Sequence, residues 1–79
     1  MNHYRKVKIA TGMNGSKIKI GDYIEAYDFY EKKWSGIKTK VIDLWHQGQD
    51  GIIAKCETAP LSDYPHYFNH RISQARKIS

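Results

Sequence analysis

Cysteine is nearly absent from this chain of 79 residues, and long apolar runs are absent altogether. Cys56 is the only cysteine, which excludes an internal disulfide and a multi-cysteine metal site. No apolar run approaches the ~20 residues of a membrane-spanning helix, and no apolar signal-peptide region follows the basic amino terminus. The sequence therefore predicts a cytoplasmic protein with no membrane partner, and a single thiol suits a reducing compartment.

Acidic residues are missing from both ends of the chain. Five basic residues and no acid lie up to Gly21, and three basic residues and no acid follow Asp63. The ends thus carry +8, while the middle has five lysines against eight carboxylates, or −3, which gives the net charge of +5. A fold that brings the ends together would form one positive surface, of the kind that attracts phosphates or acidic protein faces.

A sustained 3.6-residue period is also missing, whereas alternation with a period of two is common. Turn-forming residues interrupt this alternation at 11–16, 21–22, 29–33, 47–51 and 59–63. We expect a 3₁₀-like turn over residues 71–74, immediately before the last strand. The predicted strands span residues 5–10, 17–20, 23–28, 34–45, 52–57, 64–69 and 75–78.

A chain of this length buries only roughly 60% of its unfolded surface, so it has room for one core. No linker or internal repeat divides it, and residues 1–79 are predicted to form a single domain. Short strands with frequent turns are typical of a sandwich or a barrel. A small barrel is the better prediction, because closure removes exposed strand edges.

Two stretches carry a resemblance to a known family. An apolar-Gly-Asp step at residues 20–22 opens a strand and is followed by Trp34 and the apolar segment 40–44. Residues 70–78 have the pattern of a closing 3₁₀ turn and final strand. Together they resemble the SH3-like barrels of the Tudor and chromo-barrel type. The resemblance implies an all-β, SH3-like barrel of five to seven short antiparallel strands with a 3₁₀ turn before the last. Residues 1–16 would be an added strand and turn, and 17–79 the barrel core.

The same resemblance suggests an aromatic cage that holds a methylated ammonium by cation–π attraction. A carboxylate near the cage, such as that of Asp28 or Asp63, would help to bind the ammonium. The competing interpretation is that these rings cover a small core, and it is the more common role of aromatic side chains. The candidate aromatic binding surface consists of Tyr27, Phe29, Tyr30, Trp34 and Tyr67, with Tyr64 or Phe68 as further candidates.

Basic residues of the two ends form the second candidate site. The first and last strands of SH3-like barrels tend to be neighbours, so these residues are expected to meet. Interleaved with Tyr4, Tyr67 and His70, they have the chemistry to contact phosphates and stack on bases. Lysines on strands also serve simply to keep edges soluble. The predicted nucleic-acid-binding residues are Arg5, Lys6, Lys8, Lys17, Lys19, Arg71, Arg76 and Lys77.

Catalytic and metal-binding patterns do not emerge from the sequence. His66 and His70 are four apart in a strand-like context, without a fitting cysteine or acid. Cys56 is expected to be a small buried hydrophobe rather than a nucleophile. We therefore expect a non-enzymatic binding module with no cofactor and no metal, which engages nucleic acid or an acidic protein surface through a basic face. The alternatives are a protein-interaction adaptor or inhibitor of the kind that phages and mobile elements encode, and a reader of methyl-lysine.

Overall fold

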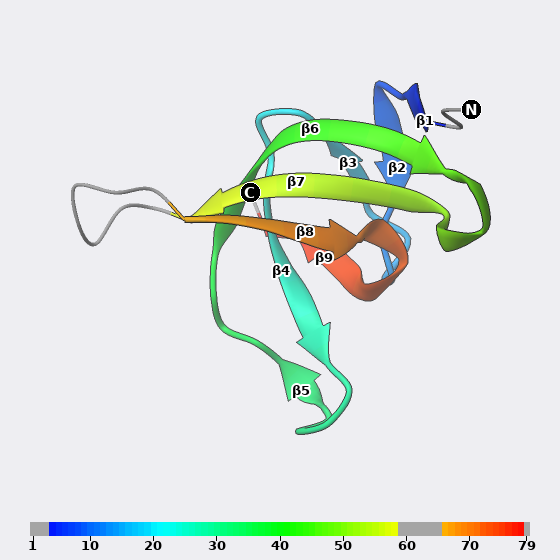
Figure 1. The fold of residues 1–79 in the computed structure, drawn as a ribbon. Helices are drawn as coiled ribbons and strands as arrows, with labels where there is room; N and C mark the ends of the chain where they lie inside the picture. Colours follow the sequence, from blue (N-terminus) through cyan, green and yellow to red (C-terminus); the bar gives the residue numbers. More distant parts are fainter. Residues whose placement is uncertain (1–3, 59–65, 79) are drawn as a thin grey trace.

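The computed structural model describes residues 4–58 and 66–78 and is built from short strands (Figure 1). Every ladder between described strands is antiparallel, and the described part contains no α-helix. The prediction of an all-β fold with a 3₁₀ turn before the last strand is confirmed. The elements are β1 (Tyr4–Lys6), β2 (Ile9–Thr11), β3 (Lys17–Lys19), β4 (Tyr23–Asp28), β5 (Lys33–Trp34), β6 (Thr39–Gln47), the 3₁₀ turn η1 (Gly48–Asp50), β7 (Ile52–Thr58), β8 (Tyr67–Arg71), the 3₁₀ turn η2 (Ile72–Gln74) and β9 (Ala75–Lys77).

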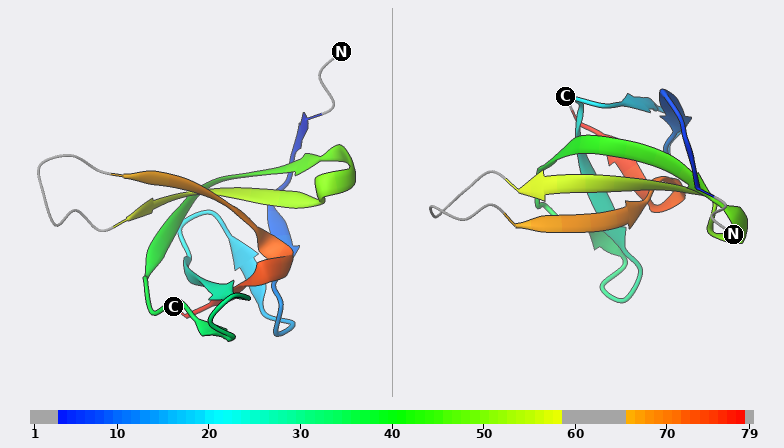
Figure 2. Two further views of the ribbon diagram at one scale, coloured as in Figure 1. Left: turned by 60° about the horizontal axis from the view of Figure 1, so that its bottom comes forward. Right: turned by 45° about the horizontal axis from the view of Figure 1, so that its top comes forward.

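One sheet contains seven of these strands. Its main order is β5-β4-β6-β7-β8, while β1 also pairs with β6 and β9 with β4. β2 and β3 form a separate hairpin. Figure 2 shows how strongly the sheet curves. Among the described residues no ladder joins β8 to β9 or to β5, so the pairing leaves the sheet open there.

A bulge in β6 determines which side chains form the core. Val41 lies opposite Cys56 and Leu44 opposite Ala54, because the register shifts by one residue between Val41 and Asp43. An extra residue in one strand reverses the alternation of side chains beyond it. Val41 and Leu44 are three residues apart in β6, whereas their partners Cys56 and Ala54 are two residues apart in β7. All four side chains nevertheless point to the same face and are fully buried.

The β2–β3 hairpin covers one side of this core. Ala10 and Ile18 are cross-strand partners, and both are buried in the core cluster. The hairpin also contacts β9, since the backbone N–H of Met13 donates to the carbonyl of Ala75 at 2.7 Å. Gly12 allows this approach: a Cβ at that position would lie 2.7 Å from the Ala75 carbonyl oxygen.

The turn at residues 21–22 starts β4 as the sequence predicts. Gly21 has a φ of +98°, in the left-handed region that glycine tolerates best. The carboxylate of Asp22 accepts a hydrogen bond from the backbone N–H of Lys19 at 2.9 Å. This bond closes the turn, so the strand begins at Tyr23.

Three predicted strand boundaries need correction. The strand predicted at residues 5–10 is two strands, because β1 pairs with β6 whereas β2 pairs with β3. The strand predicted at 34–45 is interrupted over residues 35–38, where Gly36 has a φ of +75°. β8 spans Tyr67–Arg71 and so ends two residues beyond the predicted end at 69, whereas residues 64–65 of that prediction and the loop predicted at 59–63 lie outside the described residues.

Candidate nucleic-acid interface

The convex side of β1, β6, β7 and β8 gathers aromatic and charged side chains. Residues opposite each other in an antiparallel sheet point to the same face, and so do residues two apart in a strand. Lys6 is opposite Trp45, and Asp43 is opposite Lys55. The side chains of Val41, Leu44, Ala54 and Cys56 fill the other face. We call this convex surface the outer sheet face, and its aromatic and charged members are Tyr4, Lys6, Lys40, Asp43, Trp45, Lys55, Glu57, Tyr67 and Arg71.

A hollow of about 400 Å³ lies in the outer sheet face. It is lined by Tyr4, Lys6, Asp43, Trp45 and Lys55. The ammonium of Lys6 donates to the carboxylate of Asp43 and lies 5.7 Å from the centroid of the Trp45 ring system. This hydrogen bond holds the pKa of the Asp43 carboxyl below its usual range. The hollow therefore combines two rings, two ammonium groups and an ionised carboxylate.

Two further contacts order the side chains around the hollow. The indole N–H of Trp45 donates to the side-chain oxygen of Gln47 at 2.9 Å, which fixes the ring. The ammonium of Lys55 lies 5.0 Å from the centroid of the Tyr67 ring. Lys55 makes no ion pair with the rest of the described chain, whereas Arg71 pairs with Asp50 at 3.3 Å. Lys55 is thus an exposed cation beside the exposed ring of Tyr67 and the half-buried ring of Trp45.

The structure does not gather the eight predicted basic residues on one surface. β1 pairs with the end of β6, whereas β9 pairs with β4, which meets only the start of β6. Trp45 and Lys40, the nearest residues of β6 that pair with β1 and with β4, lie about 15 Å apart along the strand at a rise of ~3.3 Å per residue. Among the predicted basic residues, Lys6 and Arg71 lie on the outer sheet face, and Arg5 is exposed on β1.

The β2–β3 hairpin presents a smaller basic group. Lys17 and Lys19 alternate with the buried Ile18, so both point outward. Lys8 is exposed immediately before β2. No acid occurs in this part of the sequence, and the described chain places no carboxylate in an ion pair with these three lysines. Because Ile18 and Ala10 of this hairpin pack into the core, the three lysines form a basic group separate from the outer sheet face.

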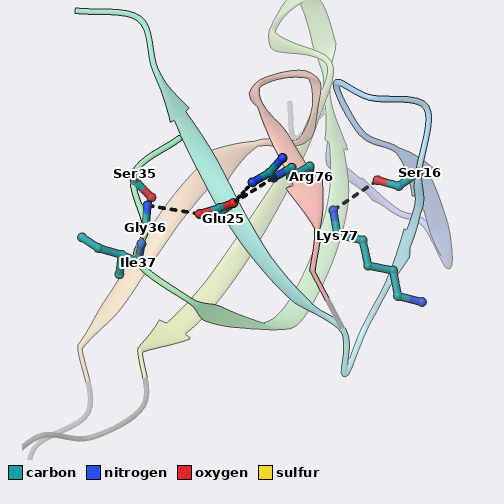
Figure 3. A network of polar contacts seen from close by, with 7 residues as sticks. All are labelled: Ser16, Glu25, Ser35, Gly36, Ile37, Arg76 and Lys77. Atoms are coloured by element: carbon teal, nitrogen blue, oxygen red, sulfur yellow. Dashed lines mark hydrogen bonds and ion pairs between the residues drawn. The ribbon is translucent and has the colours of Figure 1, made fainter. Parts of the chain in front are cut away.

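Arg76 and Lys77 are held by carboxylates of β4 and the turn before it. The guanidinium of Arg76 donates from Nε to Glu25 at 2.8 Å, and Glu25 also accepts the backbone N–H of Gly36 at 3.1 Å (Figure 3). Lys77 pairs with Asp22 at 3.7 Å, and its backbone N–H donates to the Ser16 hydroxyl. These contacts join β9 to β4 and to the β2–β3 hairpin. The charges of Arg76 and Lys77 are therefore used within the fold.

Three of the predicted aromatic residues come together on β4, β5 and the turn between them. Tyr27 makes edge-to-face contacts with Phe29 at 4.8 Å and with Trp34 at 5.2 Å between ring centroids. The guanidinium of Arg76 lies 4.2 Å from the Trp34 centroid, where a cage would bind its ligand. Tyr30 is 92% exposed. Tyr67 lies instead on the outer sheet face, and the predicted contributions of Asp63 and Tyr64 fall outside the described residues.

The remaining candidate groups, the Cys56 thiol and the His70 imidazole, are affected by burial. Cys56 is fully buried, as predicted, and burial raises the pKa of its thiol to about 11. Burial also lowers the pKa of the His70 imidazole, which stacks on Phe68. Within residues 4–58 and 66–78 no three metal-ligating side chains form a site. The same residues include no helix with the length and hydrophobicity needed to cross a bilayer.

Asp43, Trp45 and Lys55 line the hollow, and the sequence prediction includes none of them. Alternation in residues 43–45 and 53–57 indicated that their side chains share faces with other polar residues. Their meeting depends on the register of β6 and β7 across the bulge, which is a property of the fold. No protein-family model matches the chain, and no curated protein or solved structure is significantly similar to it.

Proposed function

We propose that this protein is a non-enzymatic module that binds single-stranded nucleic acid on the outer sheet face. The observation that carries the proposal is the hollow of about 400 Å³ in which Trp45 and Tyr4 alternate with Lys6 and Lys55. Modules that bind single strands combine a cationic groove for the backbone with aromatic rings on which bases stack. The outer sheet face offers both in one place.

The chemistry distinguishes single strands from duplexes. Stacking of one base on a protein ring contributes about 1–3 kcal/mol to binding, as measured by replacing the ring residue with alanine. A base is available for such stacking only when it is unpaired. Lys55 lines the hollow, is exposed and makes no ion pair with the described chain, so it is available to a phosphate. Phosphate neutralisation releases counterions, so the affinity should fall as salt rises.

The framework that we propose for this surface is an SH3-like barrel of the Tudor type. Two observations support it. β4 and β9, the first and last strands of the segment that carries the resemblance, are antiparallel neighbours. The 3₁₀ turn η2 stands immediately before β9. In this framework residues 1–16, which include β1 and β2, are additions to the barrel, and the outer sheet face would be its binding surface.

The exposed ring of Tyr30 and the half-exposed ring of Phe29 favour a second candidate function. Both stand at the tip of the β4–β5 hairpin, which Figure 1 shows extending away from β6, β7 and β8. Exposed aromatic residues are common anchors in protein interfaces. The chain would then be a protein-interaction adaptor, and Tyr30→Ala would abolish capture of a protein in nuclease-treated extract without unfolding the domain.

The test is a titration of a fluorescently labelled single strand, followed by anisotropy over a series of salt concentrations. We expect binding that is tighter than for the matching duplex and weakens steadily with salt. Lys55→Gln should weaken it several-fold and make the salt dependence shallower. Lys33→Gln on β5 is the matched control, because it removes the same charge from an exposed strand far from the hollow. Absence of binding at low salt, or equal effects of the two substitutions, contradicts the proposal.

A further inference from the structure

The hollow in the outer sheet face contains an acidic residue that a purely phosphate-binding surface does not need. The Asp43 side chain is about one-third exposed, at 32%. Its Oδ1 accepts the backbone N–H of Leu44 at 2.9 Å, and its Oδ2 accepts the Lys6 ammonium. Both oxygens are therefore fixed in position at the wall of the hollow, beside the indole ring of Trp45.

Each carboxylate oxygen has two acceptor sites, and an ionised carboxylate donates nothing. The bonds from Leu44 and Lys6 use one site on each oxygen of Asp43, which leaves one site on each. A ligand that binds both oxygens of Asp43 at once would use one remaining site on each. Such a ligand must present two adjacent hydrogen-bond donors.

Guanine is the nucleobase that meets this requirement. Its N1–H and N2 amino group are adjacent donors, and its O6 beside them is an acceptor. In adenine and cytosine the exocyclic amino group lies next to a ring nitrogen that accepts, and in uracil and thymine the single N3–H lies between two carbonyl oxygens. An acceptor placed against a carboxylate is repelled, so these bases engage Asp43 through one bond at most.

We propose that the hollow is a guanine subsite in which Asp43 binds N1–H and the N2 amino group while the base stacks on Trp45. Lys55, the cross-strand partner of Asp43, donates to O6. This inference rests on the proposed function and adds to it a preference for strands that contain guanine. A well-made bidentate contact discriminates against other bases by about tenfold.

The experiment compares short thymidine strands that differ only in one central base, which avoids the self-association of guanine tracts. The protein should bind the strand with a central guanine about tenfold more tightly than the strands with adenine, cytosine or thymine there. Asp43→Asn should remove this preference, because an amide offers one acceptor and one donor group. Glu31→Gln is the matched control, since it makes the same change of charge at an exposed carboxylate in the β4–β5 turn, away from the hollow.

The outcomes separate this inference from the proposed function. Equal affinity for all four strands, with normal salt dependence, overturns the guanine subsite and leaves single-strand binding intact. Absence of binding to any strand overturns both. If Asp43→Asn fails to fold by circular dichroism, Asp43→Glu replaces it, because it keeps the charge but moves the carboxylate by one methylene. A guanine preference that survives the folded variant also contradicts the assignment.

Discussion

The guanidinium of Arg76 lies over the indole ring of Trp34, 4.2 Å from its centroid, and is fixed there by Glu25. The contact joins β9 to the β4–β5 hairpin, because Trp34 is on β5 and Glu25 on β4. It also places the chain's own cation where the ligand of an aromatic cage would lie. A methylated lysine would have to displace Arg76, so a preference for methylated over plain peptide is not what we expect.

Trp34 and Tyr30 should differ in their effect on stability. Replacing Trp34 by alanine removes the ring that packs against Tyr27 and Arg76, and we expect a loss of about 2 kcal/mol in the free energy of unfolding. Tyr30→Ala should change it by less than about 0.5 kcal/mol, because the side chain is almost entirely exposed. Urea titration of both variants is the measurement, and similar losses in the two would contradict this division between structural and exposed rings.

Two carboxylates that both pair with arginine should also differ. The Glu25 side chain is only 9% exposed, so Glu25→Ala leaves both Arg76 and the Gly36 N–H without their acceptor and should cost about 1–3 kcal/mol. Asp50→Ala breaks the pair with Arg71, in which both side chains are about half exposed, and should cost well under about 1 kcal/mol. Thermal melts of the two variants make the comparison, and an equal effect would show that burial does not determine the strength of these pairs.

The thiol of Cys56 should be unreactive in the folded protein. Its pKa is raised to about 11 by burial, so very little thiolate exists at pH 8, and no part of the residue is exposed to a reagent. Ellman's reagent should modify the native protein only through unfolding, and should modify it at once in concentrated guanidinium chloride. Rapid modification of the native protein would contradict the placement of Cys56 in the core.

Acidification should destabilise the protein through His70. Burial lowers the pKa of this imidazole in the folded state, so the unfolded chain binds the proton more tightly. The contribution of neutral His70 to stability is complete above the ordinary pKa of 6.5 and decreases as the pH falls from there toward the lower folded value. Urea midpoints between pH 8 and pH 5 should fall less steeply in His70→Gln than in the parent. His66→Gln, an exposed control, should follow the parent, and identical slopes in all three proteins would contradict the burial of His70.

Much of the fold could be predicted from residues that act locally. The step at residues 20–22 works as a turn because Gly21 adopts a positive φ and Asp22 accepts a neighbouring N–H. Alternation around Ile18 identifies the buried side of β3 correctly. The predicted strand at residues 34–45 was too long, because Gly36 was not recognised as the position at which the chain leaves the ladder.

The candidate site was harder to predict, because it depends on pairing between distant segments. Lys6 reaches Asp43 across 37 residues of sequence, and Arg76 reaches Glu25 across 51. Charge counting showed that the ends are basic and the middle acidic. It could not show that four of the eight predicted cations pair with carboxylates from the middle, which leaves a smaller set available to a ligand.

The two tryptophans allow a direct test of where nucleic acid binds. Each gives one indole N–H resonance in a ¹H–¹⁵N correlation spectrum, and Trp45 lines the hollow while Trp34 packs under Arg76 on another part of the surface. Single substitutions to phenylalanine assign the two resonances. On titration with a single-stranded oligonucleotide at low salt, the Trp45 resonance should shift progressively and that of Trp34 should stay in place. A shift of the Trp34 resonance alone, or of neither, would contradict binding on the outer sheet face.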